Sequence, residues 1–260
     1  CIAFDADDRE FSFEEKDDVG FLKLYRFPCL AGVEDLEAQD FYLTTSPYCS
    51  STLIPDNDEM RKWDFGEMFD VKEKVKARSR NVQGVLNELG LDYVDWVKTD
   101  SQGTDLRLFK SLNDEIIKHI LVADFEPGIM DAYQGEDKLY SVLAYLNDRS
   151  FWMSDLKVFG PKRISKETIN EIPGNWTLKK SPGWAEATFI NDLDDTDLRS
   201  LLLGWVFSTV LGQHGFAYEK AKEGQQRFNE PIFKTMVSAS RRNMYPKYSL
   251  KFRIKRKLHV

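Results

Sequence analysis

Tyr93-Val-Asp-Trp-Val-Lys-Thr-Asp-Ser-Gln-Gly-Thr-Asp-Leu-Arg-Leu-Phe-Lys110 is the stretch that decides which fold we expect for this chain. It opens as an apolar strand and places Lys98 and Asp100 at the end of that strand. The chain then turns at Gly103, where a tight turn or a positive φ favours glycine, and helical spacing restarts at Leu106. A strand that ends in charged side chains and turns into a helix is where open α/β sheets bind ligands. The stretch therefore predicts an α/β fold with a site at this strand's end.

Strands and helices alternate on both sides of this stretch. The apolar patterns predict strands at residues 2–4, 22–27, 41–43, 72–77, 120–125, 151–159 and 184–190, and a long polar loop at 44–58. Helical spacing occurs at 81–89, after 106, at 138–146, and in most of the chain from 195 onward, including 215–223. This order indicates a mostly parallel sheet with helices on both faces, followed by a C-terminal helical extension. We place the domain boundary between 1–194 and 195–260.

Composition narrows the class of protein. Apolar residues make up 42% and charged residues 30% of the chain, as in ordinary globular proteins. The longest apolar run starts at Leu201 and ends by Leu211, which is too short for a transmembrane helix. Three cysteines without a Cys-x-x-Cys pair fit a reducing compartment, so we expect a cytoplasmic protein. Three scattered histidines do not indicate a metal centre.

The C-terminal end of the chain is strongly basic. Residues 241–260 contain eight Lys and Arg and no acidic residue, although the net charge of the whole chain is −7. The segment can be a solvated tail, or it can bind anions such as membrane headgroups, phosphorylated substrates or nucleic acid. We do not expect a nucleic-acid partner, and the sequence does not indicate an oligomeric state.

Acidic side chains follow three of the predicted strands. Asp5 follows the first strand, Lys98 and Asp100 end the central one, and Glu126 ends the next. The carboxyl ends of parallel strands share one edge of a sheet, so these groups can converge there. Two structural alternatives stay open. Asp5 can cap a helix, as can Asp7 or Asp8. Lys98 can pair with Asp100 or Glu126 only to fix the loops.

Residues 94–106, with Lys98, Asp100, Gln102 and Gly103, resemble the signature of FkbM-family methyltransferases. Further pieces resemble the family in the same order. They are residues 4–7 at the second strand's end, 49–53 as the Ser-Ser-Leu segment, 82–86 before the signature, 126–135 as the Glu…Pro…Tyr-x-Gly stretch, and 184–189 as the closing strand. The resemblance covers residues 2–192.

The resemblance implies a Rossmann-like methyltransferase fold that binds S-adenosylmethionine and methylates hydroxyl oxygens. It implies that Asp5 holds the ribose and that Asp100 lies near the methionine part or the acceptor. It also implies that Ser50 and Ser51 lie near the cofactor or the acceptor entrance. Asp105 departs from the pattern, because the family usually has the longer Glu at this position.

We expect Lys98, Asp100 and Glu126 to form the catalytic group, with Asp100 or Glu126 as the base that removes the hydroxyl proton. The resemblance suggests a small-molecule acceptor, such as a sugar of a glycan precursor or another small polar metabolite. The chain starts at Cys1 and shows no glycine loop after a strand. We therefore interpret it as a fragment that lacks the family's first strand and glycine loop.

Two other functions remain compatible with these residues. A non-catalytic Rossmann-like protein could bind partners through the basic tail. A nicotinamide-dependent dehydrogenase would use Asp5 in the same way, although the Lys98–Gly103 run argues against it.

Overall fold

The computed structural model describes residues 1–6, 20–172, 174, 177–194 and 196–245. Asp7, Asp8 and the basic tail from residue 246 onward lie outside the described residues. The chain divides into two compact units, Cys1–Phe189 and Ile190–Val260. We describe each unit separately.

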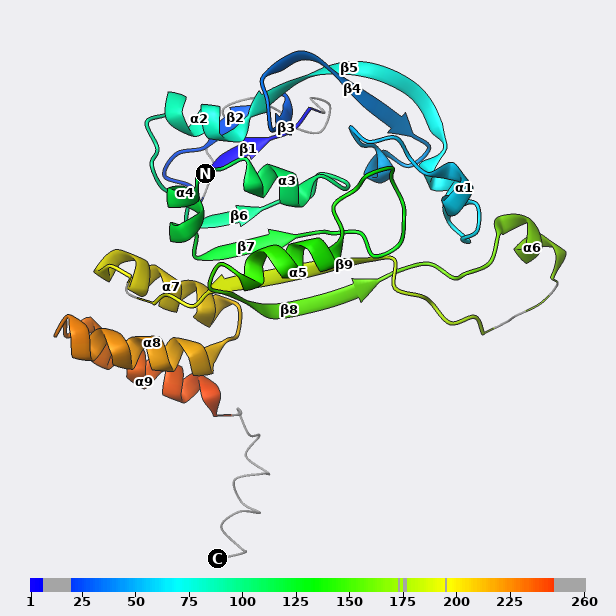
Figure 1. Cartoon of the computed structure of the whole chain (residues 1–260). Coiled ribbons are helices and arrows are strands. Elements are labelled where there is room, and N and C mark those ends of the chain that lie inside the picture. Colours follow the sequence, from blue (N-terminus) through cyan, green and yellow to red (C-terminus); the bar gives the residue numbers. More distant parts are fainter. Residues whose placement is uncertain (7–19, 173, 175–176, 195, 246–260) are drawn as a thin grey trace, which may run out of the picture. The chain divides into compact units, whose positions relative to one another are not determined.

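The strands form three small sheets (Figure 1). A two-stranded parallel sheet joins β1 (Ile2–Phe4) and β2 (Tyr25–Phe27). A mixed sheet places β5 (Val71–Asn81) between β3 (Leu30–Gly32), which is parallel to it, and β4 (Leu36–Thr44), which is antiparallel. The third sheet has the order β6 (Trp96–Lys98), β7 (Val122–Phe125), β9 (Trp184–Asn191) and β8 (Phe151–Phe159), with β6 parallel to β7.

The structure is therefore α/β, but its sheets are small and mixed rather than one mostly parallel sheet. The predicted strands at 2–4 and 151–159 are confirmed at both ends. The strands predicted at 41–43 and 72–77 are parts of the longer β4 and β5. These two strands carry alternating polar side chains and pair along most of their length, so apolar pattern alone underestimates them.

Helices of the first unit are short, and several begin at a side-chain cap. They are η1 (Pro47–Cys49), α1 (Asn57–Met60), η2 (Gly66–Phe69), α2 (Val82–Glu88), α3 (Asp105–Lys110), α4 (Asp114–His119), α5 (Leu139–Asn147) and α6 (Lys166–Glu171). Asn81, Asn113 and Ser165 accept a hydrogen bond from the backbone of α2, α4 and α6, respectively. The segment expected to be a loop at 44–58 contains η1 and the start of α1.

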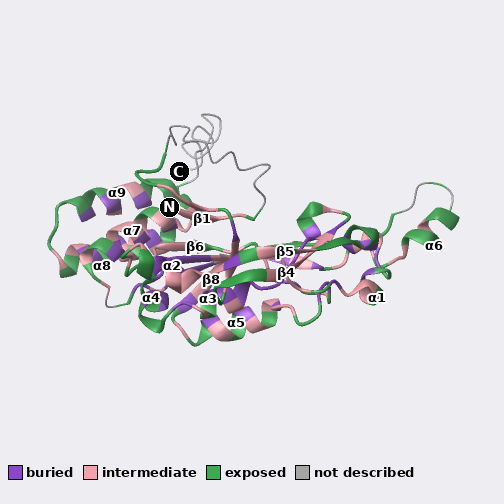
Figure 2. Cartoon of the chain, turned by 90° about the horizontal axis from the view of Figure 1, so that it is seen from above, coloured by how far each residue is buried: buried purple, intermediate pink, exposed green. Residues whose placement is uncertain are grey.

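The core of the first unit surrounds β7. Figure 2 colours the chain by burial, and β7 supplies Val122, Ala123 and Phe125 to the core, each at most 1% exposed. Phe109 of α3 packs edge-on against Phe125, with ring centroids 5.3 Å apart. Leu146 of α5 belongs to the same cluster. Because α3 and β7 share this core, the turn that precedes α3 has a rigid base.

The second unit contains α7 (Leu198–Val210), α8 (His214–Arg227) and α9 (Ile232–Met244). The helical extension predicted from 195 onward is confirmed for the described residues. Ala217 and Ala221 of α8 are fully buried, and Phe233 of α9 lies against Gly224. Small residues on α8 thus let α9 approach closely.

Three further properties concern only the described part of the chain. It contains no helix long and apolar enough to cross a membrane. It contains no group of three His, Cys, Asp or Glu side chains arranged to hold a metal ion. Cys1, Cys29 and Cys49 are free thiols, and the last two are buried.

Candidate functional site

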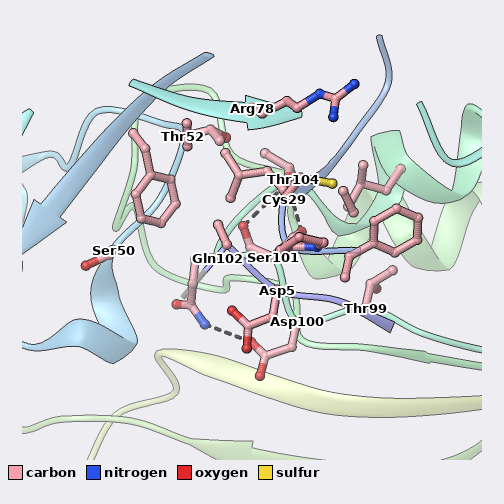
Figure 3. Close-up of a pocket in the computed structure, with 18 of the residues that line it drawn as sticks. Asp5, Cys29, Ser50, Thr52, Arg78, Thr99, Asp100, Ser101, Gln102 and Thr104 are labelled. Atoms are coloured by element: carbon pink, nitrogen blue, oxygen red, sulfur yellow. Dashed lines mark hydrogen bonds between the residues drawn. The ribbon is translucent and has the colours of Figure 1, made fainter. Parts of the chain in front are cut away.

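A cavity of about 860 Å³ opens in the first unit where β1 and β6 end (Figure 3). Four of the predicted site residues line it, namely Asp5, Ser50, Lys98 and Asp100. Its apolar wall includes Ile2, Phe4, Pro28, Leu30, Ala31, Phe41, Leu43 and Val75. The structure therefore brings side chains that lie up to 95 residues apart in sequence, Asp5 and Asp100, to one cavity. Ser51 and Glu126 are not among the lining residues.

The turn between β6 and α3 is held in a conformation that requires glycine. Gln102 has a φ of 52° and Gly103 a φ of 100°. A Cβ atom on Gly103 would lie 2.9 Å from Cβ of Glu136 and 3.1 Å from Cδ1 of Leu53. The Ser51 hydroxyl donates to the Gln102 carbonyl oxygen at 2.7 Å. Ser51 therefore fixes the turn, and its contact is with the chain itself.

Asp100 is oriented by this turn. The Gln102 side-chain amide donates to Oδ1 of Asp100 at 2.8 Å, as the dashed line in Figure 3 shows. Asp100 is exposed to the cavity, so its second oxygen can accept a hydrogen bond from a ligand. Among the described residues, Lys98 forms no ion pair with Asp100 or with Glu126. The purely structural alternative of a loop-fixing ion pair is thus not supported.

Glu126 has the proton affinity of a base that works near neutral pH. It is half-buried at the end of β7, and burial together with the negative charge of Asp100 raises its pKa to about 7. The positive charge of Lys98 acts in the opposite direction and lowers this pKa. Asp100 and Lys98 therefore act electrostatically on Glu126, although Glu126 is not among the residues that line the cavity.

Hydrogen bonds to the backbone of neighbouring segments place Asp5 and Ser50 around the cavity. The Asp5 N–H donates to the Phe27 carbonyl at 3.1 Å and extends the β1–β2 ladder. Asp5 thus stands at a strand end, as predicted. The Ser50 hydroxyl oxygen accepts a hydrogen bond from the Thr44 N–H at 3.1 Å, which ties η1 to the end of β4. Ser50 therefore lines the cavity and also fixes its wall.

Tyr133 joins three segments of the site, a role that the sequence pattern did not reveal. Its hydroxyl lies 2.9 Å from the Cys49 carbonyl oxygen and 3.3 Å from Oε1 of Gln102. Its one proton can serve one of these acceptors at a time. Burial raises the pKa of Tyr133, so the phenol stays protonated and keeps donating.

A buried ion pair under the same loop was also missed. The Glu136 side chain is 2% exposed and the Lys138 side chain 10%, and their charged atoms lie 2.6 Å apart. Glu136 also accepts hydrogen bonds from the N–H groups of Ala132 at 2.6 Å and Tyr133 at 3.3 Å. Lys138 reaches the Met130 carbonyl as well. The only sequence signal was the charged triplet of residues 136–138 directly before an amphipathic helix.

Asp105 differs from the Glu expected by resemblance and is a buried carboxyl group. It is fully buried, and its Oδ1 accepts a hydrogen bond from the Ser101 N–H at 3.2 Å. Its Oδ2 has no hydrogen-bond partner among the described residues. Burial raises the pKa of Asp105. The side chain therefore braces the start of α3 and does not reach the cavity.

In comparisons with known proteins, no family model, no curated protein and no solved structure matches this chain.

Proposed function

We propose that this chain transfers a methyl group from S-adenosylmethionine to a hydroxyl oxygen of a small polar molecule. One observation carries the proposal. Asp5 and Asp100, which follow two different strands, line one cavity together with Lys98, and Glu126, on which the charges of Asp100 and Lys98 act, has a pKa of about 7. Strand-end carboxylates around a cavity are what a nucleoside cofactor and a hydroxyl acceptor both require.

We propose a Rossmann-like arrangement for this domain. Two parallel strand pairs, β1–β2 and β6–β7, support it, because both pairs direct their carboxyl ends toward the site residues. A parallel pair linked through a helix is the unit from which such folds are built. The mixed β3–β5–β4 sheet would be an addition that walls the cavity with Leu30, Phe41 and Val75.

The lining residues offer partners for the base, the ribose and the amino-acid arm of this cofactor, although the chain shows no glycine loop after a strand. A cavity of about 860 Å³ is large enough for a nucleoside with an amino-acid arm. Asp5 would accept hydrogen bonds from the ribose hydroxyls, and Asp100 would accept from the ammonium group. Ile2, Phe4 and Pro28 would contact the base. The bound cofactor would supply a methyl group already activated on a sulfonium.

The side chains of the protein itself must carry out the remaining steps of the reaction. They must orient the acceptor hydroxyl and take up its proton. Glu126 suits the second task best, because a base with a pKa near 7 is half deprotonated at neutral pH and still has useful proton affinity. The Gln102 amide occupies one oxygen of Asp100, so the other can serve either the ammonium group of the cofactor or the acceptor hydroxyl. The positive charge of Lys98 lowers the pKa of Glu126 and so offsets part of the rise that burial causes.

A calorimetric titration of the chain with S-adenosylhomocysteine, the stable product of the cofactor, tests the proposal. We expect saturable binding that weakens at least about tenfold in Asp5→Asn, since a lost charged hydrogen bond costs about 1.5–3 kcal/mol. Asp92→Asn, an exposed carboxylate outside the cavity lining, is the matched control and should bind like the unsubstituted chain. No binding to the unsubstituted chain would refute the proposal. Binding of a nicotinamide dinucleotide instead would favour a dehydrogenase.

A further inference from the structure

β8 is an unusually exposed strand at the end of a sheet. It is the last strand in the order β6–β7–β9–β8, so one of its edges has no strand beside it among the described residues. It is nine residues long, and all five residues from Asp155 to Phe159 are exposed. Figure 1 shows it as the lowest strand of the sheet. An end strand without a neighbouring strand can pair with another strand.

This edge is apolar as well as bare. Met153, Leu156, Val158 and Phe159 are each between 38% and 48% exposed. The neighbouring helix α5, which contacts β8, adds Tyr140 at 72% exposure. Natural sheets normally protect such an edge with charges, proline or a bulge. β8 has only two charged residues, Asp155 and Lys157, and no proline.

The positions of these two charges are complementary to a second copy of the same strand. In an antiparallel pair with its two-fold axis at Leu156, Asp155 of each copy lies opposite Lys157 of the other. The same register sets Met153 opposite Phe159 and Ser154 opposite Val158. A parallel in-register pair would instead place like charges opposite each other, which destabilises a ladder. The strand is thus self-complementary in one orientation, as a two-fold interface requires.

We propose that β8 pairs with β8 of a second copy of this chain, antiparallel and centred on Leu156, and that the chain is a homodimer through this edge. The pairing adds a strand at the outer edge of β8 and shields part of its exposed apolar side chains from water. The two Asp155–Lys157 pairs fix the register. The interface goes beyond the proposed methyl transfer and does not depend on it.

Sedimentation velocity over roughly 1 to 100 µM protein tests the dimer, since this range resolves micromolar dissociation constants. We expect a species of twice the 30.2 kDa chain mass. In the variant Asp155→Lys, the new lysine of each copy lies opposite Lys157 of the other, so the dimer contains two like-charge contacts. We expect about a tenfold or greater rise in the dissociation constant. Lys157→Asp creates the mirrored repulsion. A mixture of the two variants restores both opposite-charge pairs. It should therefore form a heterodimer, whereas each variant alone stays largely monomeric.

Two controls separate pairing from folding. Lys157 also contacts Glu186 of its own chain at 3.1 Å, so thermal unfolding of each variant must be measured, and a small change is expected for this exposed pair. Lys72→Asp makes the same charge change on the exposed face of β5 and should leave the dimer intact. A monomeric unsubstituted chain overturns the proposal. So do unchanged dissociation constants in both variants, or a mixture that stays monomeric.

Discussion

Glu126 makes the proposed reaction depend on pH in a defined direction. If Glu126 accepts the hydroxyl proton, kcat/KM must fall as pH drops through its pKa of about 7. Lys98→Met removes the positive charge that lowers this pKa, so the acid limb of the profile should move to higher pH. The check is a pH profile of kcat/KM for both proteins. An acid limb that stays in place in Lys98→Met would contradict the role given to Glu126.

The raised pKa of Glu126 also predicts how the free energy of unfolding changes with pH. The folded pKa of about 7 lies above the ordinary value of 4.5, so the folded chain keeps a proton that the unfolded chain releases. Stability therefore falls as pH rises from about 4.5 to 7. Glu126→Gln should abolish this loss and stabilise the chain at pH 8 by about 1–2 kcal/mol, after allowance for solvent screening. Urea unfolding at pH 5 and pH 8 measures it, and equal effects at both pH values would argue against it.

Gly103 is required both by backbone conformation and by packing. Gly103→Ala should destabilise the chain by about 2–4 kcal/mol, since it adds left-handed strain to a clash with Glu136. Gly135 has a φ of 70° but open space around its Cβ position, so Gly135→Ala should cost only about 1 kcal/mol. Urea unfolding of both variants makes the comparison. Equal losses would show that packing against Glu136 contributes nothing.

Sequence patterns identified cavity-lining residues that follow strand ends, and missed contacts between residues far apart in the sequence. Asp5 and Asp100 were predictable because each follows a recognisable strand. The Tyr133 contact with Cys49 spans 84 residues, and only the folded chain reveals it. Ser51 was predicted near the cofactor or the acceptor entrance, and in the structure its hydroxyl donates to the Gln102 carbonyl oxygen. A pattern of residue types cannot distinguish a ligand contact from an internal brace.

At the scale of elements, the loop between β7 and α5 depends on its buried ion pair. Lys138→Met leaves Glu136 as an uncompensated buried charge and should destabilise the chain by about 3–5 kcal/mol. The loss should be larger at pH 8 than at pH 5, because at low pH Glu136 can take up a proton. The double variant Glu136→Gln with Lys138→Met should recover most of the loss. Thermal unfolding of these three proteins and of the single variant Glu136→Gln tests this, and additive losses would rule out coupling.

The hydrophobic pattern predicted the ends of helices and strands well where burial of apolar side chains determines those ends. β7 and α5 lie close to their predicted positions because each presents apolar residues to one core. α4 and α9 were not identified separately, since their sequences are rich in polar residues and their ends depend on caps and packing. The division into small mixed sheets was also not predicted. Antiparallel pairing of β4 with β5 is set by contacts that a local pattern does not contain.

At the scale of the whole molecule, the two compact units should respond separately to core substitutions. The first unit surrounds β7, whereas the second is built from helices α7 to α9. Small residues on α8 decide how closely α9 packs. A change at that contact can therefore loosen the helices of the second unit while the sheet of the first keeps its own core.

Gly224→Ala tests this independence. Its Cβ would collide with the ring of Phe233, so hydrogen-exchange protection should fall across Leu198–Met244 and stay unchanged in β6 and β7. Gly215 lies on the same helix with open space around its Cβ position, and Gly215→Ala should leave protection equal or raise it, by up to about 1 kcal/mol of helix propensity. Loss of protection in β7 as well would mean that the two units unfold as one, because only a shared cooperative transition carries a defect in α8 to the sheet.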